Sequence, residues 1–263
     1  MLRSMYSGIS GMRNFQQKLD VTGNNIANVN TFGFKKGRAT FKDMVSQQMA
    51  GATAGDPAGR GGSNPRQIGL GSQMGSVDTI NTQGSLQNTN RELDLGISGE
   101  GYFMLDDGED TFYSRAGNFY LDENGTLVNT YGYNVLDEAG NSIQIPADAQ
   151  SFSIGSNGDV NVVIDNDTEV EATIGIANFA NPEGLEKAGN NLFIPSANSG
   201  DPIETTAGED GTGELVAGVL EMSNVDLSEE FTEMIVAQRG FQANTRGITT
   251  ADEVLQELMN LKR

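Results

Sequence analysis

The stretch LSEEFTEMIVAQRGFQANTRGITTADEVLQELMN, residues 227–260, carries the strongest periodic signal in this 263-residue chain. A sustained heptad of this kind predicts a helix with one narrow apolar seam. Asp226, followed by Glu229, resembles an N-cap, and the basic pair Lys262 and Arg263 would complement the dipole at the other end. The seam residues fall seven apart, and Ala237, Ala251 and Leu258 occupy the companion position; the seam itself is Leu227, Met234, Phe241, Ile248 and Leu255.

A second seam begins at Leu2 and ends near Asn30. Its apolar residues recur at alternating spacings of three and four, with Gln16 and Gly23 in place of two expected apolar residues. This pattern predicts an N-terminal helix. The predicted seam residues are Met5, Ile9, Met12, Leu19 and Ile26.

Each of these helices alone would leave apolar side chains in water, so each requires a partner. We expect the two termini to pack against each other as a coiled-coil layer, residues 1–30 with residues 223–263. An ordinary helix pair inside one domain remains an alternative. The ten seam residues are the predicted assembly site.

Between the two predicted helices lie two segments that differ in composition and in the structure they predict. Residues 50–76 are rich in Gly and Ala and contain two Pro, which disfavours a helix, so we expect residues 31–80 to form an extended connecting arm. Residues 81–222 are expected to form an antiparallel β-rich outer domain. Three turn signals with Gly support this expectation: Asp122–Gly125, Asp137–Asn141 and Ser156–Asp159. The predicted fold class is therefore α+β.

Composition excludes many classes of enzyme. The chain has no Cys and no His, and its formal charge of −20 disfavours binding of nucleic acid. No catalytic constellation, cofactor motif or metal site is recognisable, so we expect no enzyme and no cofactor. The acidic run that starts at Asp165 begins like a calcium loop, but Val170 and Ile176 stand where Gly and Glu are needed. Without an apolar run or a cleavable signal, composition by itself predicts a cytoplasmic protein.

Motifs at both ends and in the middle resemble the flagellar rod and hook family. The N-terminal motifs are Gly23–Thr31 and Gly33–Lys36, and the C-terminal ones are Ser223–Leu227 and Phe241–Asn244. In the middle, Gly99–Phe103 and Arg115–Phe119 resemble β-domain motifs of the same family, so the resemblance covers nearly the whole chain.

The resemblance implies a structural subunit that polymerises into a helical tube around a channel and transmits motor torque. It also implies export through the flagellar type III apparatus without a cleaved signal peptide, which overrules the cytoplasmic prediction. The implied location is the hook or the basal body. The implied partners are further copies of the chain, adjoining rod, hook-cap and junction proteins, and the export apparatus.

Hook and distal rod are hard to separate within this family. The ending Asn260–Arg263 and the stretch Ser223–Asn244 look closer to hook proteins, whereas chain length and the Gly-rich arm resemble the distal rod. We favour the hook and keep the distal rod as the alternative. An alternative from another class is a secreted β-domain that binds calcium or carbohydrate.

Overall fold

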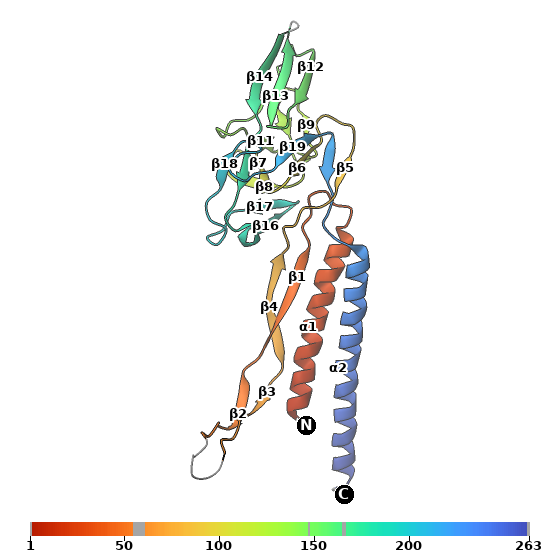
Figure 1. Ribbon diagram of the computed structural model, residues 1–263. Coiled ribbons are helices and arrows are strands. Elements are labelled where there is room, and N and C mark those ends of the chain that lie inside the picture. The colour runs from red at the N-terminus through yellow and green to blue at the C-terminus, as the bar shows by residue number, and fades with distance from the viewer. Residues whose placement is uncertain (1, 55–60, 147, 165–166, 262–263) are drawn as a thin grey trace. The chain divides into compact units, whose positions relative to one another are not determined.

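The structure is a computed structural model that describes residues 2–54, 61–146, 148–164 and 167–261. The fold is α+β, with one helix near each terminus and a β-rich central region (Figure 1). Its contacts define two units. The helical unit comprises Met1–Ile26, Gly37–Asp78 and Asp226–Arg263, and the β unit comprises Ala27–Lys36 and Thr79–Val225. Among the described residues, no helix is long and apolar enough to cross a membrane.

The two units do not repeat the three-part division expected from the sequence. Residues 37–78 group with the helices, and residues 27–36 group with the strands. The division into residues 1–30 with 223–263, 31–80 and 81–222 therefore stays a prediction. Parts of the expected arm (55–60), the acidic run (165 and 166) and the basic end (262 and 263) lie outside the described residues.

Two long helices form where the heptad patterns predict them: α1 spans Leu2–Ala27 and α2 spans Leu227–Leu261. The predicted N-cap of α2 is confirmed, because the Asp226 carboxylate accepts hydrogen bonds from the backbone N–H groups of Ser228 (2.7 Å) and Glu229 (3.4 Å). These bonds satisfy donors that the first turn of a helix leaves unpaired. The helix therefore has a well-defined start.

Residues 37–78 contain strands that the sequence did not indicate. β1 (Gly37–Asp43) pairs with β4 (Ser72–Thr79), and β2 (Ser46–Ala50) runs antiparallel to β3 (Arg66–Gly69) with Gln47 opposite Ile68. We call residues 37–78 the arm. β3 and the first part of β4 lie within residues 50–76, the Gly-rich part of the expected extended arm.

The β unit consists of short strands and one short 3-10 helix, η1 (Pro182–Gly184). Its first strands are β5 (Leu86–Asn88), β6 (Leu95–Ser98), β7 (Tyr102–Asp106), β8 (Thr111–Ser114), β9 (Tyr120–Leu121), β10 (Leu127–Val128), β11 (Asn134–Val135) and β12 (Ser151–Ile154). The others are β13 (Asp159–Ile164), β14 (Asp167–Thr173), β15 (Ile176–Asn178), β16 (Glu186–Gly189), β17 (Leu192–Ile194), β18 (Ile203–Thr205), β19 (Glu214–Ala217) and β20 (Val219–Glu221).

Strand β7 lies at the centre of the main sheet. It pairs antiparallel with β8 on one side and with β11 and β15 on the other. Successive side chains of a strand point to opposite faces. Phe103 and Leu105 accordingly enter one buried cluster, while Tyr102 and Met104 enter a second, so the sheet is covered on both faces.

The three predicted hairpin turns are confirmed. β9 and β10 meet around Gly125, whose φ of 78° is the left-handed conformation that glycine adopts without strain. A β-bridge joins Leu136 to Ser142 across the second turn, and β12 pairs with β13 across the third. Asn-Gly and Asp-rich turn chemistry thus predicted strand pairing correctly.

Candidate assembly surface

Helices α1 and α2 run antiparallel, side by side, with the two chain ends at the same end of the pair (Figure 1). Glycines lie where the helices approach each other. A Cβ placed on Gly240 would lie 2.4 Å from the Phe15 ring, and one on Gly8 would lie 3.2 Å from the Ile248 side chain. Because glycine has no Cβ, neighbouring side chains can occupy this space.

Polar groups also join the two helices. Lys18 forms an ion pair with Glu233, and the buried Asn25 Nδ2 donates to Glu230 Oε2 at 3.1 Å. Asn25 further pairs reciprocally with Gly37, donating to its carbonyl at 2.9 Å and accepting from its N–H at 3.0 Å. A single amide therefore joins α1, α2 and the first residue of the arm.

The ten predicted seam residues lie on these helices without being buried. Eight are half-buried, and the other two, Leu227 and Phe241, are 40% and 37% exposed. Contacts to the opposite helix include that of Ile248, which packs over Gly8, and that of Met12, whose sulfur accepts a hydrogen bond from Thr245 at 3.3 Å. Their joint role as an assembly seam stays a prediction.

The described positions of the pair that are buried are small or polar, and the glycines between the helices are half-buried; a search for large apolar residues overlooks both kinds. Only Ala237, which is fully buried, was expected from its place beside the seam. The spacing of glycines on both helices is the signal that could have indicated close approach. The missed residues are Gly8, Gly11, Gly240, Thr22, Asn25 and Glu230.

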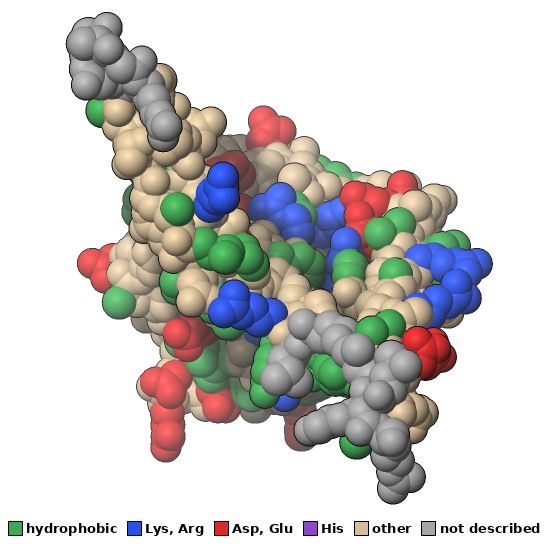
Figure 2. Space-filling model, turned by 90° about the horizontal axis from the view of Figure 1, so that it is seen from below, with side chains coloured by type: hydrophobic (Ala, Val, Ile, Leu, Met, Phe, Trp, Pro, Cys, Tyr) green, Lys and Arg blue, Asp and Glu red, His purple; other side chains and the backbone are tan. Residues whose placement is uncertain are grey.

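Helix α2 exposes a row of large apolar side chains, which we call the ridge. Phe231 is 49% exposed and Ile235 is 58% exposed, so about half of each residue remains in water. Seen from the end that carries both chain termini, the surface shows apolar patches interspersed with Lys and Arg (Figure 2). The ridge consists of the exposed Leu227, Phe231, Ile235 and Phe241, together with the half-buried Met234 between them.

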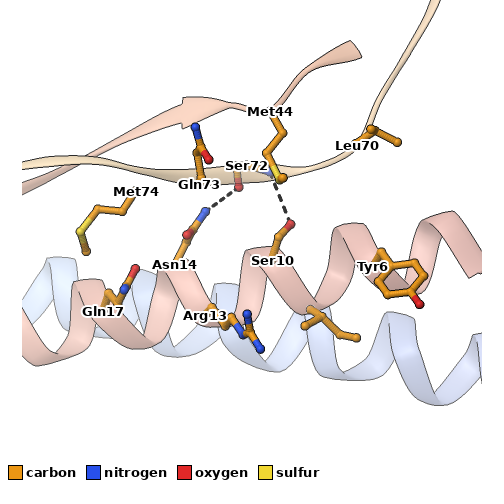
Figure 3. A pocket seen from close by; sticks show the side chains of 11 residues that line it. Tyr6, Ser10, Arg13, Asn14, Gln17, Met44, Leu70, Ser72, Gln73 and Met74 are labelled. Atoms are coloured by element: carbon orange, nitrogen blue, oxygen red, sulfur yellow. Dashed lines mark hydrogen bonds between the residues drawn. The ribbon is translucent and has the colours of Figure 1, made fainter. Parts of the chain in front are cut away.

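The arm lies against the side of α1 that Figure 3 shows. Asn14 donates to the Ser72 hydroxyl at 2.7 Å, and the Ser72 N–H donates to the Ser10 hydroxyl at 3.4 Å (Figure 3). Around these bonds a groove of about 420 Å³ opens between helix and arm. It is lined by Tyr6, Ile9, Ser10, Arg13, Asn14, Gln17, Met44, Leu70, Ser72, Gln73 and Met74.

A buried ionic cluster joins the two chain segments that lead to the helices. Lys35 Nζ donates to Glu221 Oε1 at 2.6 Å and to the Thr82 carbonyl at 2.9 Å, and Arg115 adds a contact to Glu221 at 3.4 Å. Lys35 and Glu221 are 1% and 0% exposed. Burial lowers the pKa of Lys35, and the Glu221 carboxylate partly opposes this shift.

The cluster holds both entry points of the β unit together. Gly84 N–H also donates to Glu221 at 2.9 Å, and Asn224 accepts from the Lys36 N–H at 2.8 Å. Residues 35–36, 82–84 and 221–224 are thereby tied into one structure. Of these residues, Lys35 and Lys36 lie in the N-terminal motif, Arg115 in a middle motif and Asn224 in the C-terminal motif.

Charge is distributed unevenly between the units. The β unit contains 5 basic and 25 acidic residues, so its net charge is −20, whereas the helical unit contains 11 of each and is neutral. Among the described residues, no cluster of three or more Asp and Glu side chains is arranged to hold a metal ion.

Comparison with known proteins agrees with this architecture. Residues 5–35 match the family described as flagella basal body rod protein, residues 96–162 the flagellar hook protein FlgE/F/G D1 domain, and residues 216–261 the flagellar basal body rod FlgEFG protein C-terminal family. These segments include parts of both helices and of the central sheet.

Relatives align over the entire chain. The flagellar basal-body rod protein FlgG of Bacillus subtilis (strain 168) is 61% identical, with 100% of both chains covered. The FlgG rod protein of Borreliella burgdorferi is 40% identical and the hook protein FlgE of that organism is 30% identical, again with 100% of both chains covered.

A helix at each terminus and a β-rich centre, in a chain with such relatives, define a structural subunit of the bacterial flagellum. The chain belongs to the flagellar rod and hook protein family. Its identity to the two rod proteins exceeds its identity to the hook protein, so the comparisons favour the rod, our alternative, over the hook.

Proposed function

We propose that this protein is a subunit of the distal rod, which polymerises into a straight tube and transmits motor torque. The observation that carries the proposal is the exposed apolar ridge of α2, together with the full-length similarity to basal-body rod proteins. A row of half-exposed Leu, Phe and Ile side chains on one helix requires cover by another chain. In this role the terminal helices form a coiled-coil layer, the arm connects them to the outer domain, and the ten seam residues lie at subunit contacts.

The partners follow from the same role. The chain contacts further copies of itself, the adjoining rod, hook-cap and junction proteins, and the export apparatus that delivers it. The strong negative charge of the β unit argues against nucleic acid as a partner. The role is structural, and no catalysis is required for it.

The test uses electron microscopy of purified hook-basal bodies labelled with an antibody against the β unit. Label on the straight segment near the membrane is the expected result. Label along the curved external segment would instead assign the chain to the hook, and basal bodies without label on either segment would overturn the proposal.

A further inference from the structure

Two surfaces of the helical unit remain open: the ridge on α2 and the groove between α1 and the arm. We infer that the groove of one copy receives the ridge of a second copy. This inference rests on the proposed self-assembly and specifies the surfaces that perform it. The occupant is thus α2 of another chain of the same sequence.

The groove presents apolar side chains at both ends, and at its centre the Met44 side chain lies beside two hydrogen bonds (Figure 3). Tyr6 and Leu70 lie near one end and Met74 near the other, while Asn14 and Ser10 bond Ser72 between them. The exposed fractions of Tyr6 and Leu70 are 69% and 38%, so their side chains are available for contact. An inserted row of apolar side chains would remove these ends from water.

The ridge of the same chain cannot fill this groove, because α1 uses different sides for its two neighbours. Successive residues of a helix are rotated by about 100°. Gly8, Gly11 and Phe15 therefore share the side that meets α2, whereas Ser10, Asn14 and Gln17 share the side that meets the arm. A ridge that enters this groove therefore belongs to another molecule.

A contact between two unlike surfaces of identical chains is heterologous, and such contacts build open helical arrays rather than closed dimers. The dimensions of the surfaces are compatible. At about 1.5 Å per residue, the groove side of α1 from Tyr6 to Gln17 is roughly 16 Å long and the ridge from Leu227 to Phe241 roughly 21 Å.

Charge also favours this pairing. Residues 1–26 contain 3 basic residues and 1 acidic residue, a net charge of +2, and Arg13 lies exposed at the groove. Residues 226–263 contain 4 basic and 7 acidic residues, a net charge of −3. Opposite net charges speed the approach of α2 to α1 and disfavour two ridges facing each other.

Engineered disulfides test the contact cleanly, since the chain has no Cys. Cells co-express Met74→Cys and Ile235→Cys on separate copies, and purified basal bodies are oxidised mildly and separated on a non-reducing denaturing gel. The expected result is a cross-linked dimer that neither variant forms alone. Val236→Cys is the matched control, because Val236 is 53% exposed and neighbours Ile235 but points away from the ridge; it should cross-link at least about tenfold less.

The outcomes separate the ridge-in-groove contact from the assignment to the distal rod. Basal bodies that contain the chain but show no 74–235 dimer overturn this inference and leave the rod proposal intact. A dimer of Ile235→Cys with itself would show that ridges pair with each other, which also overturns it. Basal bodies that lack the wild-type chain overturn the rod proposal and the inference with it. Should the first pair fail to assemble, Leu70→Cys with Phe231→Cys replaces it under the same criteria.

Discussion

Lys35 and Glu221 are separated by 186 residues in the sequence and form a fully buried ion pair in the β unit. Taking two charges out of water is costly, and the cost is offset by their attraction and by the hydrogen bonds to Thr82 and Gly84. Removal of one partner leaves the other charge buried with too few partners. The pair is therefore a sensitive point of the fold.

We expect Lys35→Met to lower the free energy of unfolding of the β unit by about 3–5 kcal/mol, since Glu221 loses its nearest cation. Urea unfolding followed by near-ultraviolet circular dichroism measures this change. Arg38→Met is the control, because the Arg38 side chain is 62% exposed and its guanidinium lies 3.7 Å from the Asp78 carboxylate. This variant should lower the free energy of unfolding by less than about 1 kcal/mol. Equal losses in the two variants would contradict the prediction.

Tyr113 links stability to alkaline pH. Burial raises the pKa of its hydroxyl from 10.0 to about 12. In the unfolded chain the hydroxyl ionises first, so its stabilising contribution is complete below pH 10 and falls as the pH rises towards 12. Tyr113→Phe should show a smaller decrease in unfolding free energy across this window. Lys35 and Tyr102 contribute equally to the pH dependence of the wild type and of the variant, so their contributions cancel when the two are compared. Identical slopes of unfolding free energy against pH in the two proteins would contradict the prediction.

At the scale of elements, the helix pair depends on glycine at one place and merely tolerates it at another. A Cβ on Gly240 would collide with the Phe15 ring, whereas a Cβ on Gly247 in the same helix would meet nothing within 4 Å. Gly247→Ala should stabilise α2 by about 0.5–1 kcal/mol through helix propensity, and Gly240→Ala should lower stability. Thermal melts followed by helical circular dichroism compare the two, and equal stabilisation would show that Phe15 moves aside without cost.

Phe241 is the seam residue whose replacement should affect assembly most directly. Its aromatic ring is 37% exposed on α2, and Phe241→Asp places a charge where another chain should pack. We expect loss of the chain from basal bodies and loss of motility, while the near-ultraviolet spectrum of the β unit stays unchanged. Motile cells with normal basal bodies would remove Phe241 from the seam.

At the scale of the whole molecule, the two units differ in how much of their apolar surface the chain itself covers. The β unit has two buried clusters, whereas the large apolar side chains of α2 stay half-exposed. In the free subunit we expect both termini to be trimmed by protease and a core near residues 80–220 to persist. Mass spectrometry of the fragments tests this, and resistance of α2 in the free subunit would contradict it.

Much of this architecture could be predicted from local patterns. Heptad spacing identified both helices, Asp226 marked the start of α2, and the glycine turns placed three hairpins, because each signal lies within a few residues of the structure that it specifies. The net negative charge of the chain was likewise evident from composition. Family motifs then indicated the flagellar role, although the choice between rod and hook needed whole-chain relatives.

The sequence by itself determined the helices, the turns and the net negative charge, since these depend on neighbouring residues and on residue counts. Only the tertiary structure decided that Lys35 meets Glu221, that Asn25 joins α2 to the arm, that β1 pairs with β4, and that glycines lie where the helices touch. Such contacts join residues far apart in the chain, and their partners are selected by shape and burial in the folded unit, which no local spacing encodes.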